Sequence, residues 1–553
     1  MAASFLQLLA AFLFSWFGYK ALKLVFARDP FSHIPGPAPT SWITGSMLTL
    51  FNKKALEYHI RLPKTWEGNK HHRLHEEPKF VHFRPESPAP YHHQGPKYIR
   101  RADRFLTTKP HGVRSGTSFD FGGPSSQTRK LLTPVFSIAH MREMTPLFHN
   151  VVHKLRQSIE QEVAEGEAEI DMLEWMTRTA LELIGQSGFG YSFDSLEPGS
   201  HRHPFAISLK NLVRGINTPS MMMGRFLILP YVYGIGSSRF QRIVIDALPW
   251  KDLRAVRDMV DIMHKTSVEI FEATKQSLRE GKDLSTRIGG GKDIMSILVK
   301  ANMDASVEDR MPESELLAQI STLTFAGMDT TSNALARILH LLSENQDVQD
   351  RLREEITVAY EEHGGDLDYE TLTSLPYLDA ICRETLRVYP PVPNLGRQTR
   401  QDIMLPLSSP ITTKDGQEVS EVFIPKDTRI VISLLNCNRD PKIWGPDAAV
   451  WKPERWLNPL PESVAEARVP GVYSNLMTFL GGGRACIGFK FSQLEMKVVL
   501  GLLLQSFRFS PSDKKVVWHM TGIVQPTVEG PEADGQEETR LQLPLKVSLL
   551  NAK

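Results

Sequence analysis

Apolar residues recur at helical spacing from about residue 140 to residue 390, and glycine and proline separate the periodic stretches. This pattern predicts a series of amphipathic helices, with clear examples at residues 173–185, 255–280 and 347–362. The longest follows Pro312, where a proline and two acidic residues give a typical helix start, and it extends to about Leu342.

Beyond Pro390 the pattern changes to short runs typical of strands, which proline, glycine and aspartate separate. Residues 428–435 and 541–549 are good examples of these runs. We therefore predict a mainly α fold with small β-sheets, which belongs to the α+β class. No linker is evident after residue 100, so we expect this region to form a single large domain.

The first twenty residues have a different character, because residues 2–19 carry no charge and 14 of these 18 are apolar. Eighteen helical residues rise about 27 Å, which is close to the hydrocarbon thickness of a bilayer. Basic residues follow at Lys20, Lys23 and Arg28, and this asymmetry favours a cytosolic location for the downstream chain. We predict a transmembrane anchor at residues 1–22 and a basic, proline-rich hinge at residues 23–40; a cleaved signal peptide is the alternative.

The 553 residues are enough for a large hydrophobic core, and the formal net charge is only +1. A near-neutral chain is unlike proteins that bind nucleic acid through its phosphates, so no nucleic-acid partner is expected. The three cysteines, Cys382, Cys437 and Cys486, are too few for a disulfide framework and too far apart for a paired-cysteine zinc site. The possibility that a single cysteine acts on its own as a thiolate stays open.

Cys486 stands in the glycine-rich segment FLGGGRACIG at residues 479–488, directly before a stretch with helical periodicity at 489–504. Glycines let the backbone turn sharply and approach a flat ligand, and a helix N-terminus stabilises a thiolate. Such a thiolate suits the axial position of a heme iron. A buried cysteine in a glycine-rich turn is the alternative that these residues leave open.

A second candidate is the segment AGMDTT at residues 326–331, in the middle of the longest predicted helix. Glycine and two threonines lower local helix stability, and a threonine hydroxyl can donate to the carbonyl four residues earlier. Such a site can bulge the helix and open a groove. A polar helix face with one tolerated glycine is the other interpretation.

Two further candidates are charged. Glu384 and Arg387 lie three residues apart, so they share a helix face and can form a bidentate pair. An exposed pair of this kind would contribute little stability. Arg397 follows the proline-rich run at residues 390–393, where it could bind a carboxylate or lie at the surface.

Together these segments resemble the cytochrome P-450 family. Residues 479–488 fit the family's cysteine signature, Phe-x-x-Gly-x-Arg-x-Cys-x-Gly, at every fixed position, and residues 326–331 resemble its oxygen-activation motif. Residues 384–387 resemble its Glu-x-x-Arg motif, and residues 453–456 resemble the segment that pairs with it. The likeness extends from about Arg129 to the C-terminus and is that of a microsomal fungal enzyme.

The resemblance implies a heme b cofactor, whose iron would take Cys486 as its axial thiolate ligand. Arg484, Arg397 and Arg129 would bind the heme propionates.

The remaining motif residues receive roles from the same resemblance. Thr330 would hydrogen-bond the oxygen bound at the iron, and Asp329 would relay protons to it. Glu384, Arg387 and Arg455 would form a structural cluster that supports the heme pocket.

By the same resemblance we expect a heme-thiolate monooxygenase, an oxidoreductase that inserts one oxygen atom of O2 into a hydrophobic small molecule. A terpenoid, another secondary metabolite or a xenobiotic would be the substrate. Electrons would come from NADPH only indirectly, through a separate flavoprotein reductase. The protein would be a single-pass protein of the endoplasmic reticulum membrane, with its catalytic domain, residues 41–553, in the cytosol. A heme-thiolate isomerase or dehydratase, and a non-catalytic heme-binding remnant, are the alternatives.

Two segments depart from the family pattern, so residues 71–127 are atypical. Residues 71–93 contain six of the 18 histidines and four prolines, and they show little strand signal where the family places its opening β-sheet. A solvated loop, a histidine-rich metal site and a gene-model error are the interpretations open for this segment. Ser125 stands four residues before Arg129, where the family usually carries Trp or His, and a gene-model error is the hypothesis there too.

Overall fold

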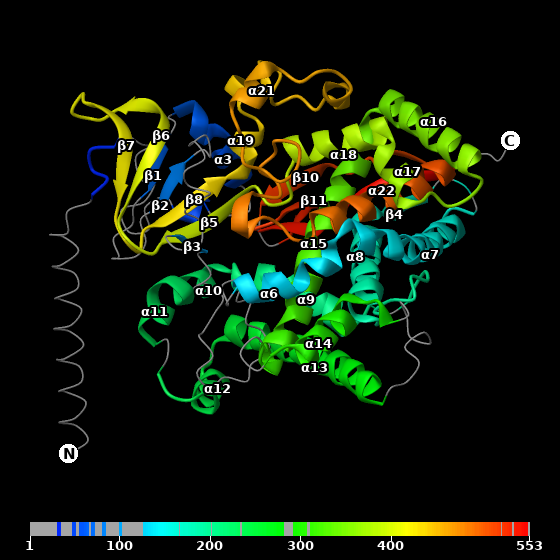
Figure 1. Ribbon diagram of the computed structural model, residues 1–553, viewed down its shortest axis with the longest axis horizontal. Coiled ribbons are helices and arrows are strands. Elements are labelled where there is room, and N and C mark those ends of the chain that lie inside the picture. The colour runs from blue at the N-terminus through cyan, green and yellow to red at the C-terminus, as the bar shows by residue number, and fades with distance from the viewer. Residues whose placement is uncertain are drawn as a thin grey trace. The chain divides into compact units, whose positions relative to one another are not determined.

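The computed structural model describes residues 30–34, 47–50, 55–65, 68–71, 80–83, 99–101, 125–164, 166, 168–200, 202–232, 235–280, 291–306, 310–520, 522–533 and 536–550. They form a mainly helical fold with small β-sheets, which confirms the predicted class (Figure 1). The contacts group the chain into two compact units. We call Met1–Ala102 with Asn394–Asn436 the sheet unit, and Asp103–Pro393 with Cys437–Lys553 the helical unit.

The sheet unit contains a five-stranded sheet in the order β1 (Gly68–His71), β2 (Phe80–Phe83), β8 (Arg429–Ser433), β5 (Asn394–Thr399) and β3 (Ile99–Arg101). β2 and β8 are parallel, and the other neighbouring strands are antiparallel. An antiparallel pair and two helices complete the described part of this unit: β6 (Ile403–Thr412), β7 (Glu418–Ile424), α2 (Met47–Leu50) and α3 (Ala55–Thr65).

Strand β2 lies inside the histidine-rich segment 71–93, where the sequence showed little strand signal. That expectation is wrong for Phe80–Phe83, which pairs in parallel with β8 and antiparallel with β1. Four residues are too short to display an alternating pattern, so this strand is defined by its two partners and not by its own sequence. The rest of segment 71–93, apart from His71, lies outside the described residues, and Ser125 begins a helix.

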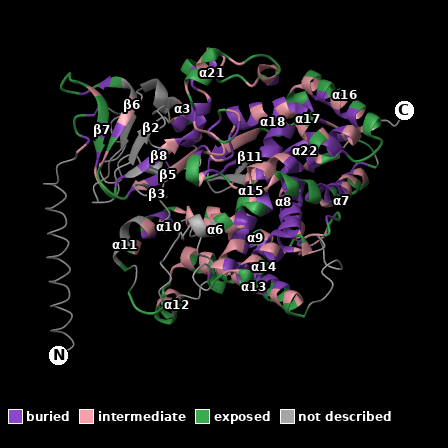
Figure 2. Cartoon of the chain, viewed as in Figure 1, coloured by how far each residue is buried: buried purple, intermediate pink, exposed green. Residues whose placement is uncertain are grey.

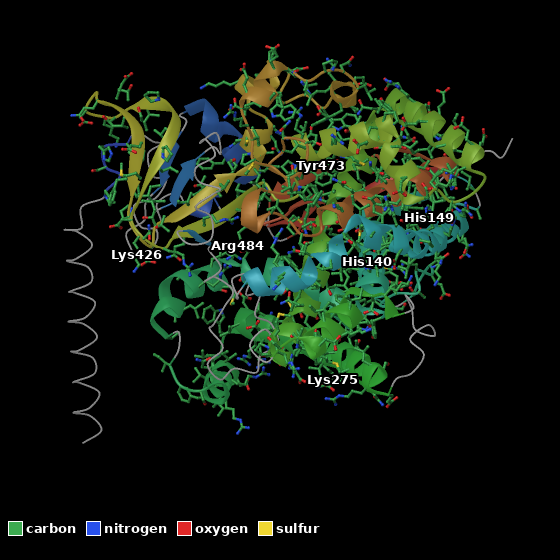
Figure 3. All side chains as sticks on the ribbon, viewed as in Figure 1. His140, His149, Lys275, Lys426, Tyr473 and Arg484 are labelled. Carbon is green, nitrogen blue, oxygen red and sulfur yellow. The ribbon has the colours of Figure 1, made fainter. Side chains whose placement is uncertain are left out.

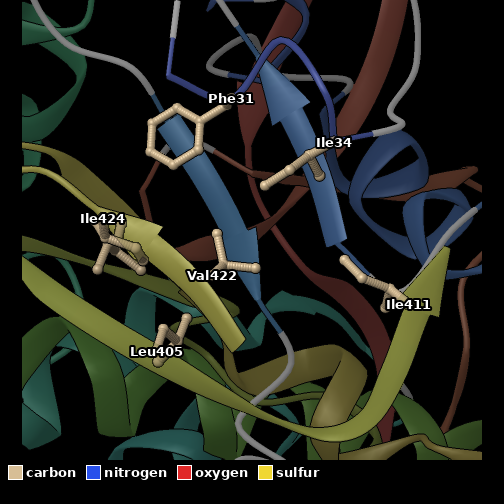
Figure 4. Close-up of a cluster of buried hydrophobic side chains, with 7 residues drawn as sticks. Phe31, Ile34, Leu405, Ile411, Val422 and Ile424 are labelled. Atoms are coloured by element: carbon tan, nitrogen blue, oxygen red, sulfur yellow. The ribbon is translucent and has the colours of Figure 1, made fainter. Parts of the chain in front are cut away.

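A cluster of buried apolar side chains forms the core beside β6 and β7 (Figure 4). The turn at residues 30–34, part of the predicted hinge, contributes to it. The buried members are Phe31, Ile34, Leu405, Ile411, Val422, Ile424 and Ile430. The backbone N–H of Lys414 also donates to the carbonyl of His33, with an N–O distance of 2.8 Å. Residues 30–34 are therefore attached to the β6–β7 hairpin by both apolar and polar contacts.

The helical unit contains the remaining helices. In chain order they are α6 (Ser125–Leu132), α7 (Ile138–Glu162), α8 (Met172–Phe189), α9 (Pro204–Ile216), α10 (Pro219–Met223), α11 (Leu229–Val232), α12 (Ser238–Ala247), α13 (Lys251–Arg279), α14 (Ile294–Asp304), α15 (Glu313–Glu344), α16 (Gln346–His363), α17 (Tyr369–Ser374), α18 (Pro376–Val388), α20 (Pro441–Trp444), α21 (Glu462–Glu466) and α22 (Phe489–Ser506). Short 3-10 or π turns lie at η2 (Pro134–Phe136), η3 (Gly224–Ile228), η6 (Pro453–Trp456) and η7 (Gly482–Arg484), and α19 (Leu434–Asn438) crosses the boundary between the units.

Helix α15 is the centre of the helical unit, because it packs against α8, α13, α18 and α22. It follows Pro312 and spans 32 residues, which confirms the longest predicted helix. Its apolar residues Leu316, Ile320 and Leu335 are buried, and its neighbour α8 is buried along most of its length (Figure 2). Apolar side chains at helical spacing therefore define the core of this unit.

Two small sheets complete the described part of the helical unit. One has the order β10 (Val516–Met520), β11 (Val524–Ala533) and β12 (Gln536–Leu541), and the other β4 (Ala168–Asp171), β13 (Pro544–Leu549) and β9 (Phe507–Pro511). Asp171 ends β4 and caps α8, and its carboxylate accepts from the N–H of Leu173 at 3.1 Å and from that of Leu543 at 2.9 Å.

In the described part of the chain, no helix combines the length and the apolar character that crossing a bilayer requires. The predicted anchor at residues 1–22 lies outside the described residues.

Candidate active site

The loop around Cys486 has the geometry that its sequence predicted. Cys486 is exposed, follows the turn η7 and lies three residues before α22 begins. Its backbone N–H donates to the carbonyl of Phe479 at 2.8 Å, which closes the loop. The alternative of a buried cysteine is therefore wrong for Cys486, and a helix N-terminus at this distance favours a thiolate. Cys382 and Cys437, by contrast, are buried, and burial raises the pKa of the Cys382 thiol to about 12.

The turn before Cys486 requires glycine at two positions. A Cβ at Gly481 would overlap the carbonyl oxygen of Pro470. Gly482 has a φ of 66°, in the left-handed region that residues with a side chain rarely adopt. Gly482 and Gly483 are exposed, so a flat ligand can approach their backbone closely.

The three arginines expected to bind carboxylates occupy different places. Arg129 on α6 donates from Nη1 to the carbonyl of Ala485 at 2.7 Å, directly next to Cys486. Arg484 is half-buried in η7 (Figure 3). Arg397 is buried on β5 in the sheet unit, where it donates to the carbonyl of the preceding residue at 2.9 Å. The structure thus brings two of the three arginines to the loop of Cys486.

Helix α22 holds the loop against α7. The ring of Phe491 meets the ring of Phe148 edge to face, with 5.0 Å between the centroids, and that of Phe136 at 6.4 Å. One turn further along α22, Glu495 is fully buried, and burial raises the pKa of its carboxyl group well above its ordinary value. Within the described residues, neither oxygen of this carboxyl group has a hydrogen-bond partner.

The predicted motif at residues 326–331 lies in the middle of α15. The hydroxyl of Thr330 donates to the carbonyl of Ala326 at 2.7 Å, the bond that the sequence predicted. Ala326 is exposed, whereas a Cβ at Gly327 would lie 3.3 Å from Ile184, so the glycine lets α8 approach closely. The bulge considered for this segment is absent, because α15 is α-helical from Glu313 to Glu344. Donation by a threonine hydroxyl to the i−4 carbonyl leaves the backbone ladder in place, since that oxygen has two lone pairs.

The carboxylate of Asp329 is buried in a polar network. The Nζ atom of Lys210 on α9 lies 2.9 Å from its Oδ1, and the amide of Gln525 on β11 donates to both oxygens at 3.2 and 3.1 Å. Asn333 donates to Oδ1 at 3.3 Å, and Lys210 also contacts the hydroxyl of Thr177 at 3.3 Å. In the described chain no hydrogen bond joins this carboxylate to the Thr330 hydroxyl. The acid is thus held by α9 and β11.

Sequence patterns did not indicate Lys210 or Gln525 as partners of this acid. They are 119 and 196 residues away from Asp329 along the chain, and neither belongs to a motif. The only local signal is that Lys210 is a basic residue within the largely apolar run of α9.

Glu384, Arg387 and Arg455 lie together and are buried. Arg387 donates to Glu384 through two bonds of 2.8 Å, and neither side chain is exposed. Nε of Arg455 lies 3.4 Å from Oε1 of Glu384, and the carboxylate also accepts from the N–H of Lys452 and the indole of Trp456, both at 3.0 Å. The spare donors of Arg387 bind the carbonyls of Asn438, Ala448 and Val450. These residues therefore connect α18 to η6, to the end of α19 and to the loop that precedes η6.

Several known proteins are similar to this chain over most of its length. Residues 35–530 match the family model described as Cytochrome P450. The chain is 44% identical over 536 residues to a cytochrome P450 monooxygenase 91 from Postia placenta, which covers 96% of each chain. It is also 49% identical over 422 residues to a cytochrome P450 monooxygenase 219 of the same fungus, covering 76% of this chain and 75% of the relative. A ganoderic acid synthetase from Ganoderma lucidum is 44% identical over 442 residues, 79% of each chain.

Proposed function

Because the chain belongs to the cytochrome P450 family, it is an oxidoreductase of the monooxygenase type, and we propose that it inserts one oxygen atom of O2 into a hydrophobic small molecule. The observation that carries this proposal is the exposed Cys486 at the start of α22, in a loop whose shape requires glycine. A terpenoid, another secondary metabolite or a xenobiotic is the substrate class.

The residues of the Cys486 loop suit a heme b group. The thiol is exposed and next to a helix N-terminus, which fits an axial thiolate. The guanidinium groups of Arg129 and Arg484 lie at the same loop and suit the propionate carboxylates, and Arg397 is the third proposed partner. When bound, heme supplies an iron whose thiolate ligand favours cleavage of the O–O bond.

Thr330 and Asp329 are proposed to handle protons. The hydroxyl of Thr330 carries a proton that its bond to the Ala326 carbonyl orients. To pass a proton from Oδ1 of Asp329 toward this hydroxyl, the carboxylate has to exchange its contact with Lys210 for one with the hydroxyl or with a bridging water. Lys210 therefore acts as a positioning residue for the acid.

The cluster of Glu384, Arg387 and Arg455 is proposed to be structural. Glu384 and Arg387 have no exposed surface, and Arg455 is 7% exposed, so their side chains have little or no access to a substrate. Their contacts to backbone carbonyls instead support the segment that precedes the Cys486 loop.

Electrons are proposed to come from NADPH through a separate flavoprotein reductase that docks near the Cys486 loop. Purified full-length protein should give the Soret band of a thiolate-ligated heme in its reduced carbon-monoxide difference spectrum. NADPH should then be consumed with product formation only after reductase is added. Turnover without external electrons would instead indicate an isomerase or dehydratase, and absence of the thiolate band would indicate a non-catalytic remnant.

Two variants test the assigned residues. Cys486→Ala should abolish the thiolate band, whereas Thr330→Ala should keep the band and consume NADPH with little product. A Thr330→Ala enzyme with normal product yield would refute its proton role. The name of the Ganoderma relative gives one product, ganoderic acid, so precursors of this compound belong in the substrate screen beside the host's own metabolite extract.

Attachment to the endoplasmic reticulum membrane is proposed through the apolar residues 1–22. Exposed apolar side chains between residues 228 and 248 support a second contact with lipid: Ile228, Val232, Ile235, Phe240, Ile243 and Leu248. Exchanging Phe240 for serine should reduce flotation with phospholipid vesicles, while exchanging Val358 on α16, which is 47% exposed against 50% for Phe240, should not. Equal flotation of both variants would argue against the second contact.

A further inference from the structure

Three metal-binding side chains meet far from the Cys486 loop in sequence. His149 and His153 lie one turn apart on the same face of α7, and Asp366 approaches them from the turn between α16 and α17. Figure 3 marks His149 on this helix. Two histidines at i and i+4 with one carboxylate form a ligand set that proteins use for zinc and related ions.

The distances fit one ion between the three groups. Nε2 of His153 lies 2.8 Å from Oδ1 and 3.0 Å from Oδ2 of Asp366, and Nδ1 of His149 lies 3.5 Å from Oδ1. All three ligand atoms lie within 4.8 Å of one another. Bonds of about 2.05 Å in a tetrahedral site separate ligand atoms by about 3.3 Å. The existing separations differ from that value by amounts that small side-chain rotations can supply.

His149 supplies an independent sign of a missing ligand. Its side chain is 2% exposed, and its Nε2 lies 2.8 Å from the carbonyl of Leu367, which can only accept, so Nε2 carries the hydrogen. In the neutral ring Nδ1 then presents a lone pair toward Asp366. Among the described residues, Nδ1 has no hydrogen-bond partner.

A cation at this place would interact favourably with both groups. The Nδ1 lone pair of a neutral His149 ring and the Asp366 oxygen, 3.5 Å apart, would each be attracted to a positive ion between them. The hydrogen bond from Nε2 to the Leu367 carbonyl fixes the tautomer and the ring orientation, as metal-binding histidines commonly require. His153 and Asp366 are 30% and 42% exposed, so an ion can reach the site and keep a water ligand.

We infer that His149, His153 and Asp366 form a binding site for a divalent transition-metal ion of the zinc type, with solvent at the fourth position. Imidazole nitrogen favours zinc, copper, nickel and cobalt over magnesium and calcium. The ion joins α7 to the segment before α17, and α7 also carries Phe148, whose ring packs on α22. The site therefore fastens the helix on which α22 rests.

The test uses the full-length, heme-loaded protein after chelation and dialysis. Co²⁺ is added as a spectroscopic probe and Zn²⁺ as a calorimetric one. Wild type should show d–d absorption for one equivalent of Co²⁺, and His153→Ala and Asp366→Asn should lose it. Both variants should bind Zn²⁺ at this site more weakly by roughly tenfold or more. The exposed His363, three residues before Asp366, gives the matched control, and His363→Ala should behave as wild type.

Segment 71–93 contains six further histidines, which are potential metal ligands, so the difference between wild type and variants is the measured quantity. Hydrogen exchange provides a second measurement, because Zn²⁺ should slow exchange at residues 364–368 and along α7 in wild type but not in Asp366→Asn. Equal Co²⁺ spectra and equal Zn²⁺ affinity in wild type and both variants would overturn the site. A loss in His363→Ala as large as in His153→Ala would do the same.

Discussion

The buried cluster around Glu384 allows a sharp test of how electrostatics support this fold. Its carboxylate accepts two bonds of 2.8 Å from Arg387, one of 3.4 Å from Arg455, and two of 3.0 Å from a backbone N–H and an indole. Glu384→Gln keeps the shape of the side chain but removes its negative charge. The NH2 group of the new amide would also face N–H groups that can only donate. The buried guanidinium group of Arg387 then loses its carboxylate partner, whereas Arg455 keeps Asp447 at 2.9 Å. Breaking a buried pair in this way costs about 3–5 kcal/mol of unfolding free energy, which corresponds to a factor of more than 100 in the folding equilibrium.

The assay is urea unfolding, followed by the Soret absorption of the heme-loaded protein and by far-ultraviolet circular dichroism. Glu370 gives a matched control, because it pairs with Arg142 and both side chains are more than half exposed. Glu370→Gln should cost about 0–1 kcal/mol. If Glu384→Gln lost no more stability than Glu370→Gln, the cluster would not stabilise the fold.

Three further predictions concern single residues near the proposed site. Gly481→Ala should lower the yield of heme-loaded protein, because the new Cβ would overlap the Pro470 carbonyl. Gly483→Ala is the control, since a Cβ there has open space around it. Equal yields of the two variants would contradict this steric argument. Burial raises the pKa of Glu495, so the folded protein holds a proton that the unfolded chain releases. The free energy of unfolding should therefore fall as the pH rises from about 4.5, until the pH passes the pKa of Glu495 in the folded protein. Urea titrations at several pH values should show that Glu495→Gln lacks this part of the slope. An unchanged slope in the variant would argue against a buried, protonated Glu495. Lys210→Met removes the cation that holds Oδ1 of buried Asp329, so the acid should lose its fixed position and the product formed per NADPH consumed should fall, while Lys210→Arg should restore it. An unchanged product yield per NADPH in Lys210→Met would show that Lys210 does not position the acid.

The helices were readable from the sequence because their apolar spacing persists over many turns. α15 is the best case, since its start at Pro312 and its buried stripe both follow from local residues. The Cys486 loop was also readable, because most of its features depend on nearby residues; the contact between Arg129 and Ala485, 356 positions apart, is an exception. Its glycines, its exposed thiol and the helix that follows are all local.

The features that were not readable depend on residues far apart in the chain. Strand β2 has only four residues, and it is defined by its pairing with β8, which follows about 350 residues later. The partner of Asp329 is a lysine on another helix, and the bulge considered at Thr330 is absent, since α15 stays α-helical while the Thr330 hydroxyl donates to the Ala326 carbonyl. The His149–Asp366 contact likewise joins segments 217 positions apart, so spacing alone could suggest the two histidines but not the carboxylate.

The sheet formed by β4, β13 and β9 has a consequence for how the protein folds. β13 is the central strand, so β4 and β9 pair with it and not with each other. During synthesis the ribosome makes β4 more than 370 residues before β13, and the N–H of Leu543 that binds the cap of α8 arrives equally late. Until then the edge of β4 and the start of α8 lack their native partners. A chain with such distant pairings is expected to fold slowly and to need protection of its early segments during translation.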